Sequence, residues 1–193
     1  MNYVVFDIET RNIFEDVGSN NAADLDISVI SVYEKDTDTV KSFLQEDFAE
    51  MWPIFERADA LVGYNSNHFD IPLLNKYYPG DLNHIKSIDL MVAIKESKFG
   101  KRPKLDNVAN ATLGKNKIAH GLEAVAWWKQ GEIDKIKKYC EEDVMITKQI
   151  FEYILKNKSV KVPDKITNKV SEYEIDTTGW LDKEGPAMTK SLF

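Results

Sequence analysis

Asn2-Tyr3-Val4-Val5-Phe6-Asp7-Ile8-Glu9-Thr10, residues 2–10, is the stretch around which the chain is organised. Apolar residues alternate along it, as in a strand, where residues two apart point to the same side of the sheet. Asp7 and Glu9 therefore project together from a strand rich in Val and Phe. Two adjacent carboxylates in apolar surroundings are costly unless a cation neutralises them, and hard oxygen ligands favour Mg²⁺ or Mn²⁺ over zinc. The alternative interpretation is that the strand has ended and both carboxylates are solvated.

The composition of the 193-residue chain is that of an ordinary soluble globular protein, with 43% hydrophobic and 30% charged residues. No apolar run is long enough to span a bilayer, so we expect no membrane segment. We identify no signal peptide, and the single cysteine, Cys140, fits a reducing compartment, which favours a cytoplasmic protein. The formal net charge of −7 disfavours a protein that coats nucleic acid by electrostatics alone. It does not disfavour an enzyme whose bound cations meet the phosphates.

Strands come first along the chain, and helices and strands alternate afterwards. Residues 27–33 and 39–44 are β-branched and aromatic runs around a polar turn, which predicts a hairpin that extends the first strand into a meander. Further strands are predicted at 60–64 and 85–90, and helices at 46–57 (with a break or kink at Pro53), at 68–78, from 91 onward, from 105 to Gly114, at 121–129 and at 132–156. This order predicts an α/β fold with a mixed sheet.

The last part of the chain differs from the rest. Residues 157–193 lose hydrophobic periodicity and carry Pro163, Gly179, Gly185 and Pro186. We therefore expect one domain over residues 1–158, followed by a C-terminal tail or arm of unknown role at 159–193, lying over the surface or poorly ordered.

A third acidic position, Asp70, follows the predicted strand at 60–64 across a short polar loop. If that strand lies beside the first one, its carboxyl end opens at the same edge of the sheet as Asp7 and Glu9, where ligand sites of α/β sheets collect. By itself, Asp70 is better explained as an acid in the first turn of a helix, where the helix dipole favours negative charge.

Two more candidates lie on the last long helix. Tyr139 and Asp143 are four residues apart and hence on one face, and Asp143 adjoins the apolar stripe, so we expect its carboxylate to be at least half buried. Taken alone, Tyr139 is explained as an aromatic residue at the edge of the core, and Asp143 as an exposed helix acid.

The combination of these motifs resembles that of the DEDD superfamily of 3′–5′ exonucleases. The motifs are Asp7-x-Glu9, Phe69-Asp70 and Tyr139-x-x-x-Asp143. Tyr139 is similar to the tyrosine of the DEDDy branch. The resemblance covers roughly residues 1–156, and Asn65, Asp89 and the stretch 104–109 add to it. It implies a ribonuclease-H-like fold with a five-stranded mixed sheet flanked by helices, which makes residues 1–158 an exonuclease domain.

The resemblance also implies a chemistry. Two divalent cations, Mg²⁺ or Mn²⁺, would lie about 4 Å apart. Asp7 would bridge both ions, Glu9 and Asp143 would complete one of them, and Asp70 would act on the second, directly or through water. A water activated by one ion would attack the terminal phosphodiester of a single-stranded DNA or RNA with a free 3′ end. Tyr139 would orient that water rather than act as a base, because a phenol has a pKa near 10.

Residues that resemble the family's nucleotide-binding positions are the backbone amides near Thr10 and Arg11, together with Asn65 and Phe69. Trp127 and Trp128 could stack on bases or pack in the core. A basic set could contact the phosphate backbone or be a solvated surface: Lys98, Lys101, Arg102, Lys104, Lys115 and Lys117. Cys140 is predicted to be a core residue. We expect His68 in a loop and His120 at a helix start, without zinc partners.

A metal-dependent 3′–5′ exonuclease is thus the function that the sequence favours. The alternative is a catalytically silent nucleic-acid-binding module of a larger replication or repair assembly. The presence of all four acids and of Tyr139 favours the enzyme. The sequence does not distinguish DNA from RNA, since discrimination of the 2′-hydroxyl depends on pocket geometry. Nor does it distinguish proofreading from repair, or identify a polymerase or other partner.

Overall fold

A five-stranded sheet with the strand order β3-β2-β1-β4-β5 forms the centre of the protein. The structure is a computed structural model, and it describes residues 1–115, 121–164, 167 and 169–182. The strands of the sheet are β1 (Tyr3–Thr10), β2 (Ile27–Glu34), β3 (Thr39–Phe43), β4 (Ala60–Gly63) and β5 (Ser87–Asp89). β1, β2 and β3 form an antiparallel meander, and β4 and β5 add to β1 in parallel. The predicted meander, the mixed sheet and the α/β class are confirmed.

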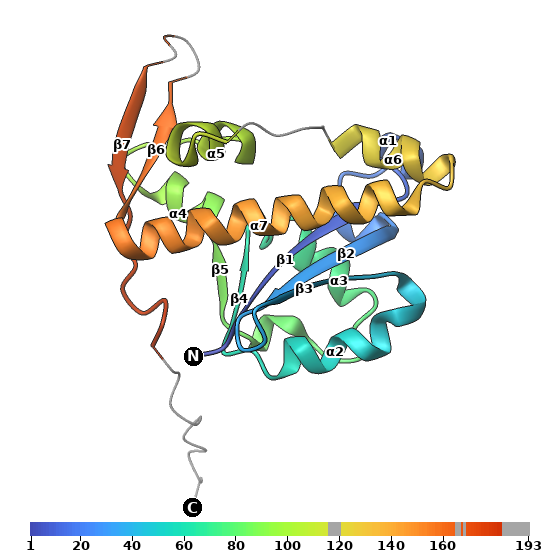
Figure 1. The fold of residues 1–193 in the computed structure, drawn as a ribbon. Coiled ribbons are helices and arrows are strands. Elements are labelled where there is room, and N and C mark those ends of the chain that lie inside the picture. Colours follow the sequence, from blue (N-terminus) through green and yellow to red (C-terminus); the bar gives the residue numbers. More distant parts are fainter. Residues whose placement is uncertain (116–120, 165–166, 168, 183–193) are drawn as a thin grey trace, which may run out of the picture.

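Helices cover both faces of this sheet, and the longest of them, α7 (Ile133–Asn157), crosses one face from end to end (Figure 1). The other helices are α1 (Phe14–Val17), α2 (Phe48–Glu56), α3 (Asp70–Asn75), α4 (Leu90–Glu96), α5 (Leu105–Leu113) and α6 (Gly121–Lys129). Short 3-10 turns lie at Ala22–Asp24, Gln45–Asp47 and Leu82–His84. α2 continues through Pro53, so the predicted break is not seen. No helix within the described ranges has both the length and the apolarity needed to cross a bilayer.

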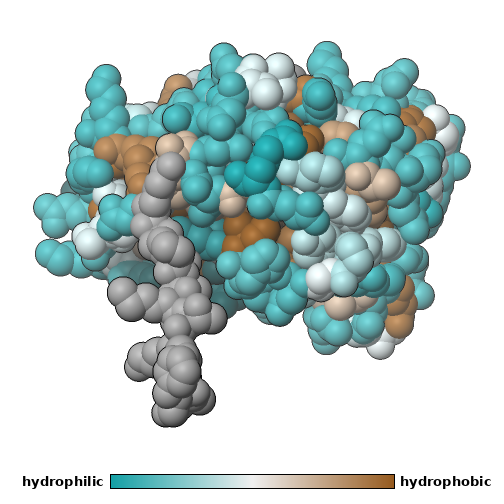
Figure 2. All heavy atoms as spheres, turned by 90° about the horizontal axis from the view of Figure 1, so that it is seen from below, coloured by the Kyte–Doolittle hydropathy of each residue, from teal (hydrophilic) through white to brown (hydrophobic). Residues whose placement is uncertain are grey.

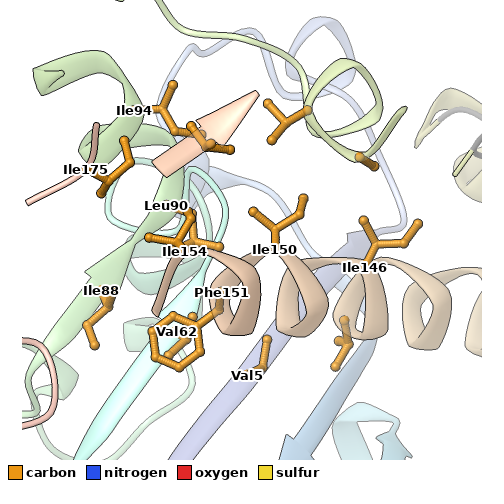
Figure 3. Close-up of a cluster of buried hydrophobic side chains, with 14 of the residues drawn as sticks. Val5, Val62, Ile88, Leu90, Ile94, Ile146, Ile150, Phe151, Ile154 and Ile175 are labelled. Carbon is orange, nitrogen blue, oxygen red and sulfur yellow. The ribbon is translucent and has the colours of Figure 1, made fainter. Parts of the chain in front are cut away.

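The alternation of β1 decides which of its side chains meet α7. Tyr3 and Val5 belong to a buried cluster with residues of α7. Figure 3 shows Val5 beneath this helix, which contributes Ile146, Ile150, Phe151 and Ile154. The intervening residues of β1 point to the opposite face, where they pack with α2 and α3: Val4, Phe6 and Ile8. Asp7 and Glu9 continue the first series, and therefore lie on the face that α7 covers.

Beyond residue 158, where we expect an arm or a poorly ordered tail, the chain forms a hairpin of β6 (Ser159–Pro163) and β7 (Val170–Glu174). The buried side chains of Val160 and Val162 join the same core cluster as α7. Of the two alternatives, an arm over the surface or a poorly ordered tail, the hairpin favours the arm for these two strands. The hairpin was not recognised because the strands are short and β7 carries glutamates on its exposed side. Residues 183–193 of the predicted tail lie outside the described residues.

The surface seen from below is largely hydrophilic, and its hydrophobic patches are small and separate (Figure 2). Among the described residues, the large hydrophobic side chains that are exposed are Val170 and Leu181.

Candidate active site

Three of the predicted carboxylates meet where β1 passes under α7. Asp7 and Glu9 of β1 and Asp143 of α7 each offer an oxygen, and these oxygens all lie within 4.8 Å of one another. Glu9 is 8% exposed and Asp143 is 4% exposed, so the expected burial of Asp143 is confirmed. Like charges at this distance in a buried position repel one another strongly unless a cation or a proton is shared. The donor set consists only of carboxylate oxygens, which fits Mg²⁺ or Mn²⁺.

The local shape of β1 helps to bring these side chains together. The pairing of β1 with β2 shifts register between Glu9 and Thr10, so that Glu9 faces Val29 whereas Thr10 faces Ile27. Such an irregularity bends a strand and redirects its side chains, and irregularities of this kind are common beside active sites. It lies directly after the two carboxylates, at the end of β1.

Asp70 lies close to β1 but outside the group of three. It begins α3, is 5% exposed, and lies close enough to β1 for the backbone amide of Ile8, the residue between Asp7 and Glu9, to favour its charged form. The parallel pairing of β1 with β4 ends at Val5, which leaves the edge of β1 beyond it open to α3. Burial, and then the nearby carboxylate of Asp89, raise the pKa of Asp70 to about 7. β4 does lie beside β1 as expected, so Asp70 and the other acids share one edge of the sheet.

Asp89 holds the loop that carries Asn65 and leads to Asp70. Its carboxylate accepts hydrogen bonds from the backbone N–H of Asn65 at 2.9 Å and of Asn67 at 3.0 Å. The same carboxylate caps α4 by accepting from Met91 N at 3.0 Å and Val92 N at 3.2 Å. Asn65 takes a left-handed conformation with φ 66°, and α3 begins only at Asp70, later than predicted. The clamping role of Asp89 was not predicted, although an aspartate directly before an apolar helix is a capping signal.

Gly63, at the end of β4, allows this loop to fold back closely. A Cβ atom at this position would lie 2.4 Å from Cβ and 2.5 Å from Oγ of Ser66. Gly63→Ala is therefore expected to displace the loop, to lower the free energy of unfolding by about 1–3 kcal/mol and to reduce activity. Urea unfolding and a nuclease assay measure the two effects. Gly63→Ala combined with Ser66→Gly should recover most of both, because the second change removes the clashing atoms; an equally impaired double variant would contradict this explanation.

Tyr139 lies one helical turn before Asp143, and its ring is almost fully buried, with 4% exposure. Its ring meets that of Trp127 edge to face, with 5.9 Å between the centroids and an interplanar angle of 75°. Burial, followed by the charges of Asp143, Glu9 and Asp7, raises the pKa of the Tyr139 hydroxyl far above its usual value. A phenol is protonated at neutral pH even at its usual pKa of about 10, so the hydroxyl is available as a hydrogen-bonding group.

A cleft of about 1000 Å³ opens beside Glu9. Three of the predicted nucleotide-binding residues line it, namely Thr10, Asn65 and Phe69. Other lining residues include Phe14, Tyr64, His68, Arg102, Lys104 and Val125. The cleft thus combines the carboxylate of Glu9, aromatic rings and two basic side chains. His68 lies in a loop, as predicted.

Arg11 is not among the residues that line this cleft. Its backbone N–H donates to the carbonyl of Asp26 at 2.8 Å, and its guanidinium lies over the ring of Trp128, 4.5 Å from the centroid. The Arg11 amide is therefore paired within the fold, and a nucleotide contact by the backbone amides near Thr10 and Arg11 stays a prediction. The hydroxyl of Thr10 donates to the carbonyl of Asn12 at 2.8 Å, so Thr10 is held in place at the cleft.

The remaining candidates have structural roles where they are described. Cys140 is fully buried, and its thiol donates to the backbone carbonyl of Asp7 at 3.2 Å, which confirms the prediction of a core residue. Trp127 and Trp128 are partly buried and pack against neighbouring side chains. Of the basic set, Arg102 and Lys104 line the cleft, whereas Lys98 lines a different cavity near β5. Lys117 and His120 lie outside the described residues.

A sequence model described as the RNase_H superfamily matches residues 4–155, which include all of the acidic positions discussed above. The chain belongs to the RNase_H superfamily. Membership of this superfamily confirms the ribonuclease-H-like fold. It also supports a nuclease type of function, a nucleic acid substrate and a requirement for divalent metal, for which the buried group of Asp7, Glu9 and Asp143 is suited.

Among solved structures, this RNase_H superfamily chain is similar to the family B DNA polymerase from the hyperthermophilic archaeon Pyrobaculum calidifontis, with a TM-score of 0.60 and 20% sequence identity. The similarity covers 80% of this chain and 24% of the polymerase chain, so the present chain spans about a quarter of that protein. At this identity the likeness supports the fold alone. Comparison with curated protein sequences found no match.

Proposed function

We propose that this chain is a metal-dependent 3′–5′ exonuclease of the DEDDy type. Its substrate is single-stranded DNA or RNA with a free 3′ end, and it hydrolyses the terminal phosphodiester bond. The observation that carries the proposal is the group of Asp7, Glu9 and Asp143, with oxygens within 4.8 Å of one another. This group lies beside the buried Tyr139 and at the edge of a cleft of about 1000 Å³.

The carboxylates define where two divalent cations would bind. Asp7, Glu9 and Asp143 would hold one ion, and Asp7 and Asp70 would hold the other, with Asp70 acting directly or through water. Bound Mg²⁺ or Mn²⁺ would lower the pKa of the attacking water and stabilise the charge on the leaving 3′ oxygen. The backbone amide of Ile8 favours the charged form of Asp70, whose carboxylate therefore lies near β1.

Tyr139 orients the attacking water in this proposal. A phenol, with its usual pKa of about 10, keeps its proton at neutral pH. Tyr139 therefore positions the water by hydrogen bonding and does not remove a proton from it. The neighbouring Asp143 lies on the same side of α7, so one helix supplies both the metal ligand and the orienting group.

The cleft holds the terminal nucleotide. Its volume of about 1000 Å³ is at the upper end of the range for ligand pockets, about 300–1,000 Å³. Phe69 supplies an aromatic surface, and Phe14 supports it edge to face with ring centroids 6.1 Å apart. Arg102 and Lys104 on the cleft wall provide positive charge for the phosphates of the strand.

The proposal is tested with DNA and RNA oligonucleotides that are labelled at one end and blocked at either end. We expect mononucleotides to be released from the 3′ end in Mg²⁺ or Mn²⁺, and none in excess chelator. A 3′ phosphate should block the reaction, whereas a 5′ phosphate should have little effect. Cleavage of a closed single-stranded circle would contradict exonuclease action, and full activity in chelator would contradict the metal mechanism. A catalytically silent nucleic-acid-binding module, the alternative, would bind the same oligonucleotides and release no product.

A further inference from the structure

The turn between α6 and α7 has a defined geometry. Gly131 takes a left-handed conformation with φ 72°, and its N–H donates to the carbonyl of Trp128 at 3.0 Å. The next N–H, that of Glu132, donates to the carbonyl of Trp127 at 2.9 Å. These two bonds around a left-handed glycine are the pattern of a Schellman motif, which ends a helix sharply. The end of α6 is therefore held against the beginning of α7, as Figure 1 shows.

This arrangement places the Trp127 ring against the ring of Tyr139. The edge-to-face contact has 5.9 Å between centroids, and both rings belong to a small cluster that is separate from the two main parts of the core. The other members of this cluster are Val29, Ala124, Ile136, Cys140, Leu44, Trp128 and Ile133. An aromatic pair of this geometry prefers one relative orientation, so Trp127 restricts the positions that the Tyr139 ring can take.

The other contacts of α6 also lead to the candidate active site. The guanidinium of Arg11, two residues after Glu9, lies over the ring of Trp128 at 4.5 Å. Val125, two residues before Trp127, lines the cleft beside Glu9. Movement of α6 relative to β1 is therefore opposed at Arg11, and the Trp127 ring is held at a constant place relative to the carboxylates.

From these contacts we propose that Trp127 is a positioning residue, which sets the direction of the Tyr139 hydroxyl toward the attacking water. The inference rests on the proposed function, since it assigns a task to Tyr139 in the exonuclease reaction. Trp127 is not among the residues that line the cleft. It acts through the ring of Tyr139, and loss of its ring should leave metal binding intact.

The test is a double-variant cycle with steady-state kinetics on a single-stranded oligonucleotide in Mn²⁺. Trp127→Leu should lower kcat on the order of tenfold with little change in KM, because a small misplacement of a catalytic group is costly. Trp127→Phe keeps an aromatic ring and should retain most of the rate. In the Tyr139→Phe background, where no hydroxyl remains to be oriented, Trp127→Leu should cause little further loss.

Several outcomes would overturn the inference. An equal loss of kcat from Trp127→Leu in both backgrounds would mean that Trp127 acts through the fold and not through the hydroxyl, and an unchanged kcat would mean that it does not act at all. The matched control is Trp180→Leu, because the Trp180 ring also packs on an aromatic ring, that of Phe151, with 5.8 Å between centroids. This variant should leave kcat unchanged. If Trp127→Leu does not fold, the same double-variant cycle is measured with Trp127→Met, whose longer side chain fills more of the space left by the Trp127 ring. Unchanged turnover in Tyr139→Phe alone would contradict the role of Tyr139 in the proposed function, whereas a failure confined to Trp127 would leave that function intact.

Discussion

Asp7→Asn is expected to abolish nuclease activity and the stabilisation by divalent metal together. Asp7 is the proposed ligand of both ions, and it shares a group with Glu9 and Asp143 in which the oxygens lie within 4.8 Å of one another. Ligands that bind only the folded state raise the melting temperature, so Mg²⁺ or Mn²⁺ should stabilise the wild-type protein. The variant should lose this shift, and its activity should fall on the order of a thousandfold or more, about 4 kcal/mol in transition-state stabilisation.

The melting temperature without metal separates this effect from misfolding. Asparagine has nearly the same shape as aspartate and removes one of the mutually repelling charges, so the metal-free variant should be at least as stable as the wild type. Asp36→Asn, in the exposed turn between β2 and β3, is a matched control that should retain both activity and the metal-induced shift. A normal metal shift in Asp7→Asn would show that the ion binds elsewhere.

Asp143→Asn is expected to produce the second largest loss, greater than that of Tyr139→Phe. Tyr139→Phe removes only the hydroxyl and should reduce the rate on the order of ten- to a thousandfold, about 1.4–4 kcal/mol, with metal binding and melting temperature nearly unchanged. Asp143→Asn should reduce the rate more, because it weakens binding of the ion that the Asp143 carboxylate would hold. Since both side chains would act on one water, the double variant should lose less than the product of the two single losses.

Asp134→Asn is the control for this series, because Asp134 is an exposed carboxylate in the first turn of α7, away from Tyr139 and Asp143. It should keep full turnover. If Tyr139→Phe keeps the turnover of the wild type, Tyr139 only packs in the core. The proposed site would then consist of its four acids alone. Strictly multiplicative losses in the double variant would indicate that Tyr139 and Asp143 do not act on the same water.

Much of the acidic site is predictable because its geometry is local. The side-chain period of a strand places Asp7 and Glu9 on one side, and the period of a helix places Tyr139 and Asp143 on one side. The position of Asp70 followed from the rule that ligand sites collect at the carboxyl edge of parallel strands, and β4 does pair with β1 in parallel. The meander is also a local feature, since a polar turn between two β-branched runs is sufficient to indicate it.

The features that were missed depend on contacts between distant parts of the chain. Asp89 joins the loop after β4 to the start of α4, and the backbone N–H groups that it accepts from carry no sequence signal. The N–H of Arg11 is used by the carbonyl of Asp26, which residue type does not reveal. β6 and β7 are stabilised by packing of Val160 and Val162 into the core beside α7, although the strands themselves are short.

The sequence by itself determined the α/β class, the meander and the pairs of chemically active residues on β1 and α7, because these follow from the repeat of a single element. Only the tertiary structure decided how these pairs meet. The crossing of α7 over β1 brings Asp143 to Asp7 and Glu9, and the open edge of β1 beyond Val5 brings Asp70 close to Ile8. It also decided that Trp127 packs on Tyr139, since that contact requires the sharp turn at Gly131. Such contacts are set by the relative placement of whole elements, which the pattern within one element does not encode.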